Sequence, residues 1–159
     1  MATLSKHQND FLYIVATHAV RCSQESKIPP SVKIAQAILE SDWGRSELAR
    51  KANNLYGIKA KEWAGPRYRK LTSEYIGGRR VEIFAEFRKY ESWVKCIEDH
   101  DKFLQRPVYR AAERFKGDAI QYAQAIARCG YATDPFYAVK LAGIIDKYNL
   151  RKYDEQVKD

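Results

Sequence analysis

The chain has 159 residues, 45% of them hydrophobic and 30% charged, a composition that excludes a disordered tail and fits one globular domain. Its 28 Lys and Arg against 20 Asp and Glu give a net charge of +8, which favours a polyanionic partner such as nucleic acid, anionic lipid or an anionic cell-wall polymer. No stretch approaches the ~20 apolar residues of a membrane span, so we expect no stable membrane insertion.

The cysteines and the first apolar run indicate where the protein is made. Cys22, Cys96 and Cys129 cannot all pair within one chain and match neither a disulfide framework nor a zinc site. Free, buried thiols in a reducing compartment are therefore expected. The run Phe11–Val20 contains His18 and lacks a small-residue cleavage site, so we expect no signal peptide and synthesis in the cytoplasm.

The first part of the chain has helical periodicity. Apolar residues follow a mainly helical spacing from about residue 5 to 22, and Pro29-Pro30 precedes a second helix that is expected from Ser31 to about Ser41. Gly44 is expected to end this second helix, and residues 46–52 are expected to form a short third one.

The middle of the chain alternates like strands. Polar and apolar residues alternate between Leu71 and Tyr90, around the pair Gly77-Gly78, which is a good signal for a two-residue hairpin loop. With these glycines as the loop, Glu74 would face Val81 across the hairpin and share its face with Ile83. A carboxylate on an apolar hairpin face is unusual, which makes Glu74 a candidate functional residue.

Helices resume after the hairpin, and four are expected. Their bounds are about 93–104, 107–115, 119–129, and from Pro135 through to Tyr148. Ser92 and Asp118 are placed to cap two of them, and Thr133 or Asp134 to cap the last. The sequence therefore predicts an α+β fold that is mostly helical, with a small antiparallel hairpin.

Several kinds of site are missing from the sequence. The chain has no phosphate-binding Walker loop, no dinucleotide-binding glycine motif and no serine-hydrolase motif. His7, His18 and His100 form no chelating pair, and we expect them to be ordinary surface or boundary residues. Neither a metal nor a cofactor is therefore expected.

Glu40 stands out because it ends an otherwise apolar helix. The negative end of the helix dipole and apolar neighbours both raise the pKa of a carboxyl group. An acid that is still protonated near neutral pH can donate a proton to the leaving oxygen of a glycosidic bond. The alternative for Glu40 is a solvated side chain at a frayed helix end.

The residues around Glu40 belong to a longer pattern. The pattern comprises AQAILESDWG (35–44), ANNLYGIK (52–59), FRKY (87–90) and GYATDP (130–135). In this order these segments resemble the signature of glycoside hydrolase family 73, which contains bacterial and phage peptidoglycan hydrolases of the N-acetylglucosaminidase type. Asp42 departs from the small residue that commonly follows Glu-Ser, and Tyr56 replaces the more usual Phe.

The resemblance implies a lysozyme-like α+β fold. A helical lobe, about 5–60 and 91–150, and a small β-lobe, about 66–90, would flank a groove for a glycan. The whole chain, 1–159, would then be one catalytic domain, expected to act as a monomer.

The resemblance also implies catalytic residues. The general acid of the family falls on Glu40, and the aromatic residue of the final motif falls on Tyr131. Some members have a second important Glu in the hairpin, which falls on Glu74, with Glu62 as a weaker rival. If Glu74 activates water, the two carboxyl groups should lie roughly 6.5–9.5 Å apart and the reaction inverts; if the 2-acetamido group of the substrate attacks, the configuration is retained.

Five further residues are candidates for binding the substrate, each with an alternative. Asn53 and Asn54 could bond to sugar groups or could turn the chain. Trp43 and Tyr56 could stack on sugar faces, although for Trp43, close to the Gly44 stop, packing of the helix end is favoured. Trp63 could lie at the rim of the groove or anchor the hairpin.

The activity implied is hydrolysis of the β-1,4 bond between N-acetylglucosamine and N-acetylmuramic acid in peptidoglycan. A lytic transglycosylase on a related fold and an inactive wall-binding module are alternatives. A nucleic-acid-binding domain is less well supported, because the Lys and Arg residues are spread along the chain without a dense recognition helix. The expected lack of a signal peptide favours a phage or prophage endolysin that reaches the wall after release. A domain of a larger secreted autolysin is the alternative.

Overall fold

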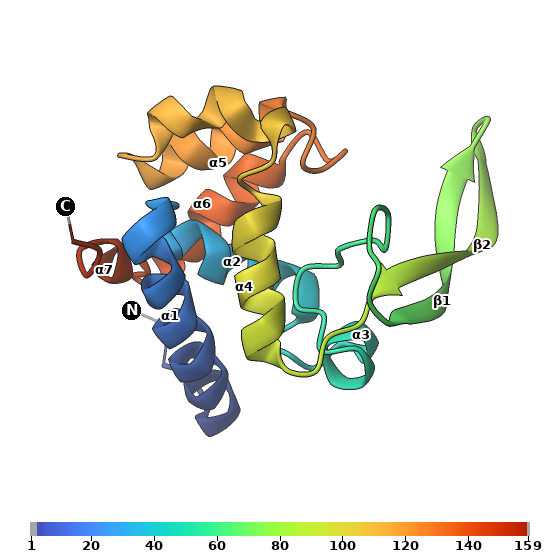
Figure 1. Cartoon of the computed structure of the whole chain (residues 1–159), viewed down its shortest axis with the longest axis horizontal. Coiled ribbons are helices and arrows are strands. Elements are labelled where there is room, and N and C mark those ends of the chain that lie inside the picture. The colour runs from blue at the N-terminus through green and yellow to red at the C-terminus, as the bar shows by residue number, and fades with distance from the viewer. Residues whose placement is uncertain (1–2, 159) are drawn as a thin grey trace.

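The computed structural model describes residues 3–158 (Figure 1). The helices and strands, in chain order, are α1 (Lys6–Ser26), α2 (Pro30–Ser41), α3 (Glu47–Lys51), β1 (Arg67–Ile76), β2 (Arg79–Arg88), α4 (Trp93–Phe103), the 3₁₀ helix η1 (Pro107–Phe115), α5 (Ala119–Arg128), α6 (Tyr137–Lys147) and α7 (Arg151–Asp154). The predicted α+β class is confirmed. In Figure 1 the helices form one body, and the hairpin projects from it at the end opposite to both termini.

Two boundaries and one additional helix differ from the sequence prediction. α1 continues to Ser26 and ends where Lys27 adopts a left-handed conformation with φ 62°. The last long helix begins at Tyr137 instead of Pro135, because the Asp134 side chain accepts a hydrogen bond from the Phe136 N–H (2.8 Å) and forms a turn there. The short α7 was not expected.

Helix α2 forms the centre of the helical body. It packs against α1, α5, α6 and α7, and its residues from Pro30 to Ile38 are buried. A helix that is apolar around its whole circumference is a core helix. Only its last turn reaches the surface, so α2 carries Glu40 from the core to the edge of the body.

The turn after Glu40 is fixed by close packing. Asp42, Trp43 and Gly44 all have positive φ, and a Cβ at Gly44 would lie 2.6 Å from the Trp93 ring. Gly44 is therefore required both for its conformation and for the space it leaves. The Ser41 hydroxyl bridges the turn, since it donates to the Ala37 carbonyl (2.6 Å) and accepts from the Gly44 N–H (2.9 Å).

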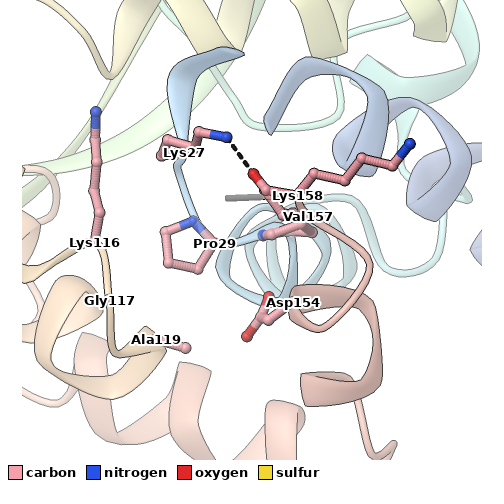
Figure 2. A pocket seen from close by; sticks show the side chains of 9 residues that line it. Lys27, Pro29, Lys116, Gly117, Ala119, Asp154, Val157 and Lys158 are labelled. Carbon is pink, nitrogen blue, oxygen red and sulfur yellow. Dashed lines mark hydrogen bonds between the residues drawn. The ribbon is translucent and has the colours of Figure 1, made fainter. Parts of the chain in front are cut away.

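The other end of α2 is capped by a residue that is distant in sequence. Pro29, at the N-cap position, makes no side-chain cap. Instead Asp154 in α7 accepts hydrogen bonds from the Ser31 N–H (2.8 Å) and hydroxyl (2.6 Å). Figure 2 shows Asp154 beside a hollow of about 440 Å³, across which the Lys27 side chain donates to the Lys158 carbonyl. The C-terminal segment is thus fastened to the start of α2.

We expect Asp154→Ala to destabilise the protein by about 0.5–2 kcal/mol, the usual cost of losing a helix cap. Urea unfolding followed by circular dichroism measures this. Glu155→Ala is the matched control, because Glu155 is the exposed next residue, and it should change the free energy of unfolding by less than about 0.5 kcal/mol. Equal effects of the two substitutions would show that the cap contributes nothing.

The hairpin has the predicted register. Glu74 pairs with Val81 around the Gly77-Gly78 turn, as the alternation predicted. Glu74 and Val81 lie on its less exposed face, yet this face is not covered by the helical body, since Ile83 on it is 39% exposed. The hairpin therefore resembles an arm with two accessible faces.

Two further sequence expectations concern the cysteines and the membrane. All three cysteines are free; Cys96 is buried, whereas Cys22 and Cys129 are only half-buried. Between residues 3 and 158, no helix has both the length and the apolar character that a membrane crossing requires.

Candidate active site

Glu40 lies on the last turn of α2, where the side chain reaches solvent. Protein atoms around its carboxyl group nevertheless raise its pKa from the usual value, and this desolvation outweighs the opposing effect of the Lys140 ammonium. Lys140 is itself paired with Asp134 of the GYATDP segment, at 2.5 Å. The predicted direction of the pKa shift is confirmed, and burial is its main cause.

A groove of about 550 Å³ is lined by Tyr131, whose pKa the Glu40 carboxylate influences, although Glu40 itself is not part of the lining. Its walls come from three chain segments, 56–61, 103–109 and 129–131. Lys59 in the first of them forms an ion pair of 3.8 Å with Glu74, so the hairpin carboxylate is held next to the groove. The side chain of Glu74 is 38% exposed and accessible to a ligand.

Tyr131 connects the groove to Glu40. It lines the groove, and its ring stacks on Tyr137 with a centroid distance of 5.5 Å. Burial, together with nearby Tyr137 and Glu40, raises the pKa of Tyr131 well above its usual value. The hydroxyl is therefore neutral and acts as a hydrogen-bonding group at the groove.

His100 is a residue that the sequence analysis placed wrongly. It is fully buried, not at the surface. Its imidazole stacks on the Tyr56 ring at 3.6 Å, and its two nitrogens lie 3.0 Å from Lys33 Nζ and 3.3 Å from Tyr131 Oη. A lysine in the middle of the apolar α2 sequence was the one signal that could have indicated a buried polar partner.

Asn54 and Tyr56 form the inner wall of the groove. The Asn54 amide donates to the carbonyls of Ile58 (3.0 Å) and Arg88 (2.9 Å), and its oxygen accepts from the N–H groups of Tyr56 and Ile58. Because the amide nitrogen and the amide oxygen of Asn54 both bond to the backbone, the chain-turning role is favoured for this residue. Tyr56 is 4% exposed, so it lines the groove as a floor more than as a free stacking platform.

Three other candidates lie outside the groove lining. Trp43 is buried edge-on against Phe11 and Tyr148, which favours the packing alternative. Trp63 donates to the Pro66 carbonyl (2.8 Å) at the base of the hairpin, which favours the anchoring alternative. Asn53 is half-buried and donates to the Tyr90 carbonyl (3.0 Å).

Two acidic residues of the sequence analysis lie at exposed turns. The Asp42 carboxylate is paired with Arg45 (3.0 Å), which occupies it on the surface. Glu62, the rival of Glu74, is an exposed loop residue with φ 58°. The carboxylate of Glu74 forms an ion pair with Lys59, a residue of the groove lining, and this contact makes Glu74 the stronger candidate of the two.

Comparisons with known proteins identify the family of this chain. The chain is 40% identical to the exo-glucosaminidase LytG of Bacillus subtilis over 153 residues, which cover 93% of this chain and 54% of that protein. It is 36% identical to the peptidoglycan hydrolase FlgJ of Salmonella typhimurium, over 98% of this chain and 50% of the relative. The chain thus spans about half the length of the curated relatives it matches.

A solved structure of a similar domain matches nearly the whole of this chain. The catalytic domain of the autolysin Auto from Listeria monocytogenes superposes with a TM-score of 0.82 and 34% identity, over 96% of this chain and 90% of that one. The predicted lysozyme-like fold is confirmed. The family of mannosyl-glycoprotein endo-β-N-acetylglucosaminidases matches residues 16–150. By this match over most of its length, the chain belongs to the glucosaminidase family, glycoside hydrolase family 73.

Proposed function

We propose that this chain hydrolyses the glycan strands of peptidoglycan, at the β-1,4 bond that follows N-acetylglucosamine, with Glu40 as the general acid. One observation carries the proposal: a carboxyl group with a raised pKa stands at the end of a buried helix, close enough to influence the pKa of Tyr131, which lines an open groove. A carboxylic acid in such surroundings can stay protonated until it donates to the leaving oxygen. The exo-glucosaminidase LytG and the peptidoglycan hydrolase FlgJ, to which the chain is similar, support the same substrate class.

The reaction requires one proton donor and one acceptor. Glu40 transfers its proton to the glycosidic oxygen as the bond to the anomeric carbon breaks. In the inverting route, Glu74 takes a proton from the water that adds to that carbon. In the retaining route, the substrate's acetamido oxygen attacks first, and Glu74 orients that group or balances the charge that develops. The ion pair of Lys59 with Glu74 would hold the hairpin arm at the groove in either case.

Tyr131 and Tyr56 are the remaining groups that we assign to the substrate. Asn53, whose amide donates to the Tyr90 carbonyl and which is not part of the groove lining, is assigned the chain-turning role. The Tyr131 hydroxyl would bind the sugar or its acetamido group, since it lines the groove beside Glu40. Tyr56 would form the apolar floor beneath the sugar. For Trp43, Trp63 and Asn54 we assign the packing and turning roles that their contacts support.

We further propose that the helical body and the hairpin act together as one catalytic domain, as a monomer. The net charge of +8 would hold the protein on the anionic wall. Salt ions screen this attraction, so binding to the wall should weaken as the salt concentration is raised. A phage or prophage endolysin and a domain of a larger autolysin are both compatible with this activity.

Digestion of purified peptidoglycan tests the proposal. Fragments are reduced with borohydride and their ends identified by mass spectrometry. We expect reduced N-acetylglucosamine ends. Reduced N-acetylmuramic acid ends would contradict the bond assignment, and anhydro ends would favour the lytic transglycosylase.

A further inference from the structure

A buried polar chain runs from α2 to Tyr131 through α4. Lys33 of α2 and His100 of α4 are both 0% exposed, and the neighbouring Asp101 is 7% exposed. Lys33 Nζ lies 3.0 Å from His100 Nδ1, and His100 Nε2 lies 3.3 Å from Tyr131 Oη. This chain of contacts ends at the groove but is not used by the proposed reaction itself.

Three acceptors surround the lysine. Lys33 Nζ lies 3.4 Å from the Ile97 carbonyl, 3.4 Å from Asp101 Oδ1 and 3.0 Å from His100 Nδ1. An ammonium group has three N–H donors and no acceptor, so all three are satisfied only if Nδ1 carries a lone pair. Asp101 is further fixed by the Ser26 hydroxyl (3.0 Å) and by Gln105 (3.1 Å), which keeps its carboxylate in place.

With Lys33 as an ammonium beside the Asp101 carboxylate, this arrangement requires a lone pair on His100 Nδ1, and the carboxylate opposes the lowering of the Lys33 pKa by burial. Burial and, next to it, the Lys33 ammonium lower the pKa of His100 well below its usual value, which favours a neutral ring. A neutral imidazole that accepts at Nδ1 donates at Nε2. The Tyr131 hydroxyl then accepts from His100, and its own proton points away from α4, toward the Tyr137 hydroxyl or a group in the groove.

We infer that His100, oriented by Lys33, is a positioning residue that turns the Tyr131 O–H away from α4 and toward the groove. The inference rests on the proposed function, because it assigns the direction of a hydrogen bond to the substrate. Burial of a lysine costs desolvation, which an apolar side chain of similar size would avoid. What Lys33 adds at this place is a directional N–H donor.

The tautomer can be measured without an activity assay. Long-range ¹⁵N–¹H NMR of the wild-type protein at neutral pH separates a protonated from an unprotonated ring nitrogen. We expect a protonated Nε2 and an unprotonated Nδ1 for His100. A protonated Nδ1, which donates to a neutral Lys33 amine, would overturn the inference. This readout holds even if the protein cleaves no peptidoglycan, so its failure and that of the proposed function are distinguishable.

Two variants of matched polarity test the role in catalysis. Glutamine places its amide nitrogen near the position of Nε2, whereas asparagine reaches only the position of Nδ1. We expect His100→Asn to lower kcat by about tenfold, the effect of one lost hydrogen bond, and His100→Gln to retain most of it. Equal losses in both variants would indicate packing alone and contradict the inference.

A double-mutant cycle locates the effect on Tyr131. If His100 acts through the Tyr131 hydroxyl, His100→Asn should lower kcat no further in a Tyr131→Phe background. Independent, multiplicative losses would contradict the positioning role. Unfolding curves of each variant accompany the cycle, and the wild-type NMR measurement decides the case if a variant does not fold.

Discussion

Glu40→Gln should lower the rate of peptidoglycan cleavage by about 10²–10⁴-fold, the range expected when a general acid is removed. Glutamine keeps the size of the side chain but has no proton to give to the leaving oxygen. Glu40 reaches solvent at the end of α2 and makes no ion pair among the described residues. The free energy of unfolding should therefore change by less than about 0.5 kcal/mol.

Release of reducing ends from purified peptidoglycan measures this rate. Glu25→Gln is the control, because Glu25 is an exposed glutamate near the end of α1 and is not part of the groove. It should cleave at the wild-type rate. An active, folded Glu40→Gln variant would remove the general acid from our account.

Glu74→Gln should lower the cleavage rate by about 10²-fold or more, in the range for loss of a general base. The substitution keeps the shape of the side chain but removes the charge that pairs with Lys59 and that would accept a proton or balance a developing positive charge. The hairpin should stay folded, because an exposed ion pair contributes little to stability.

Two substitutions separate this role from general effects on the hairpin. Glu82 is exposed on the opposite face of the same hairpin, and Glu82→Gln should leave the rate unchanged. Glu62→Gln tests the rival carboxylate. A normal rate for Glu74→Gln together with a large loss for Glu62→Gln would transfer the second role to Glu62, whereas normal rates for both would assign it to the substrate.

Local patterns were sufficient to predict the hairpin and the surroundings of Glu40. The register of Glu74 against Val81 follows from a period of two and from the Gly-Gly turn, which are both local features. The direction of the Glu40 pKa shift could be predicted from its apolar neighbours, and desolvation by burial is its main cause. Short-range periodicity and the identity of a few turn residues determine both results.

Contacts between distant segments could not be predicted in this way. His100 is buried because three elements meet around it and supply Tyr56, Lys33 and Tyr131, and no sequence spacing shows that meeting. The cap on α2 comes from Asp154, more than a hundred residues away. For the same reason the partners of Trp43, Phe11 and Tyr148, became visible only with the fold, although its packing at the helix end could be expected from the following Gly44.

Cleavage in ¹⁸O-labelled water tests the central claim most directly. Purified peptidoglycan is digested with the wild-type protein, and the new ends are weighed by mass spectrometry. Our account predicts N-acetylglucosamine ends that carry one ¹⁸O at the anomeric carbon, because water adds where the bond to the leaving oxygen breaks. Anhydromuramic ends without the label, or no new ends at all, would contradict it.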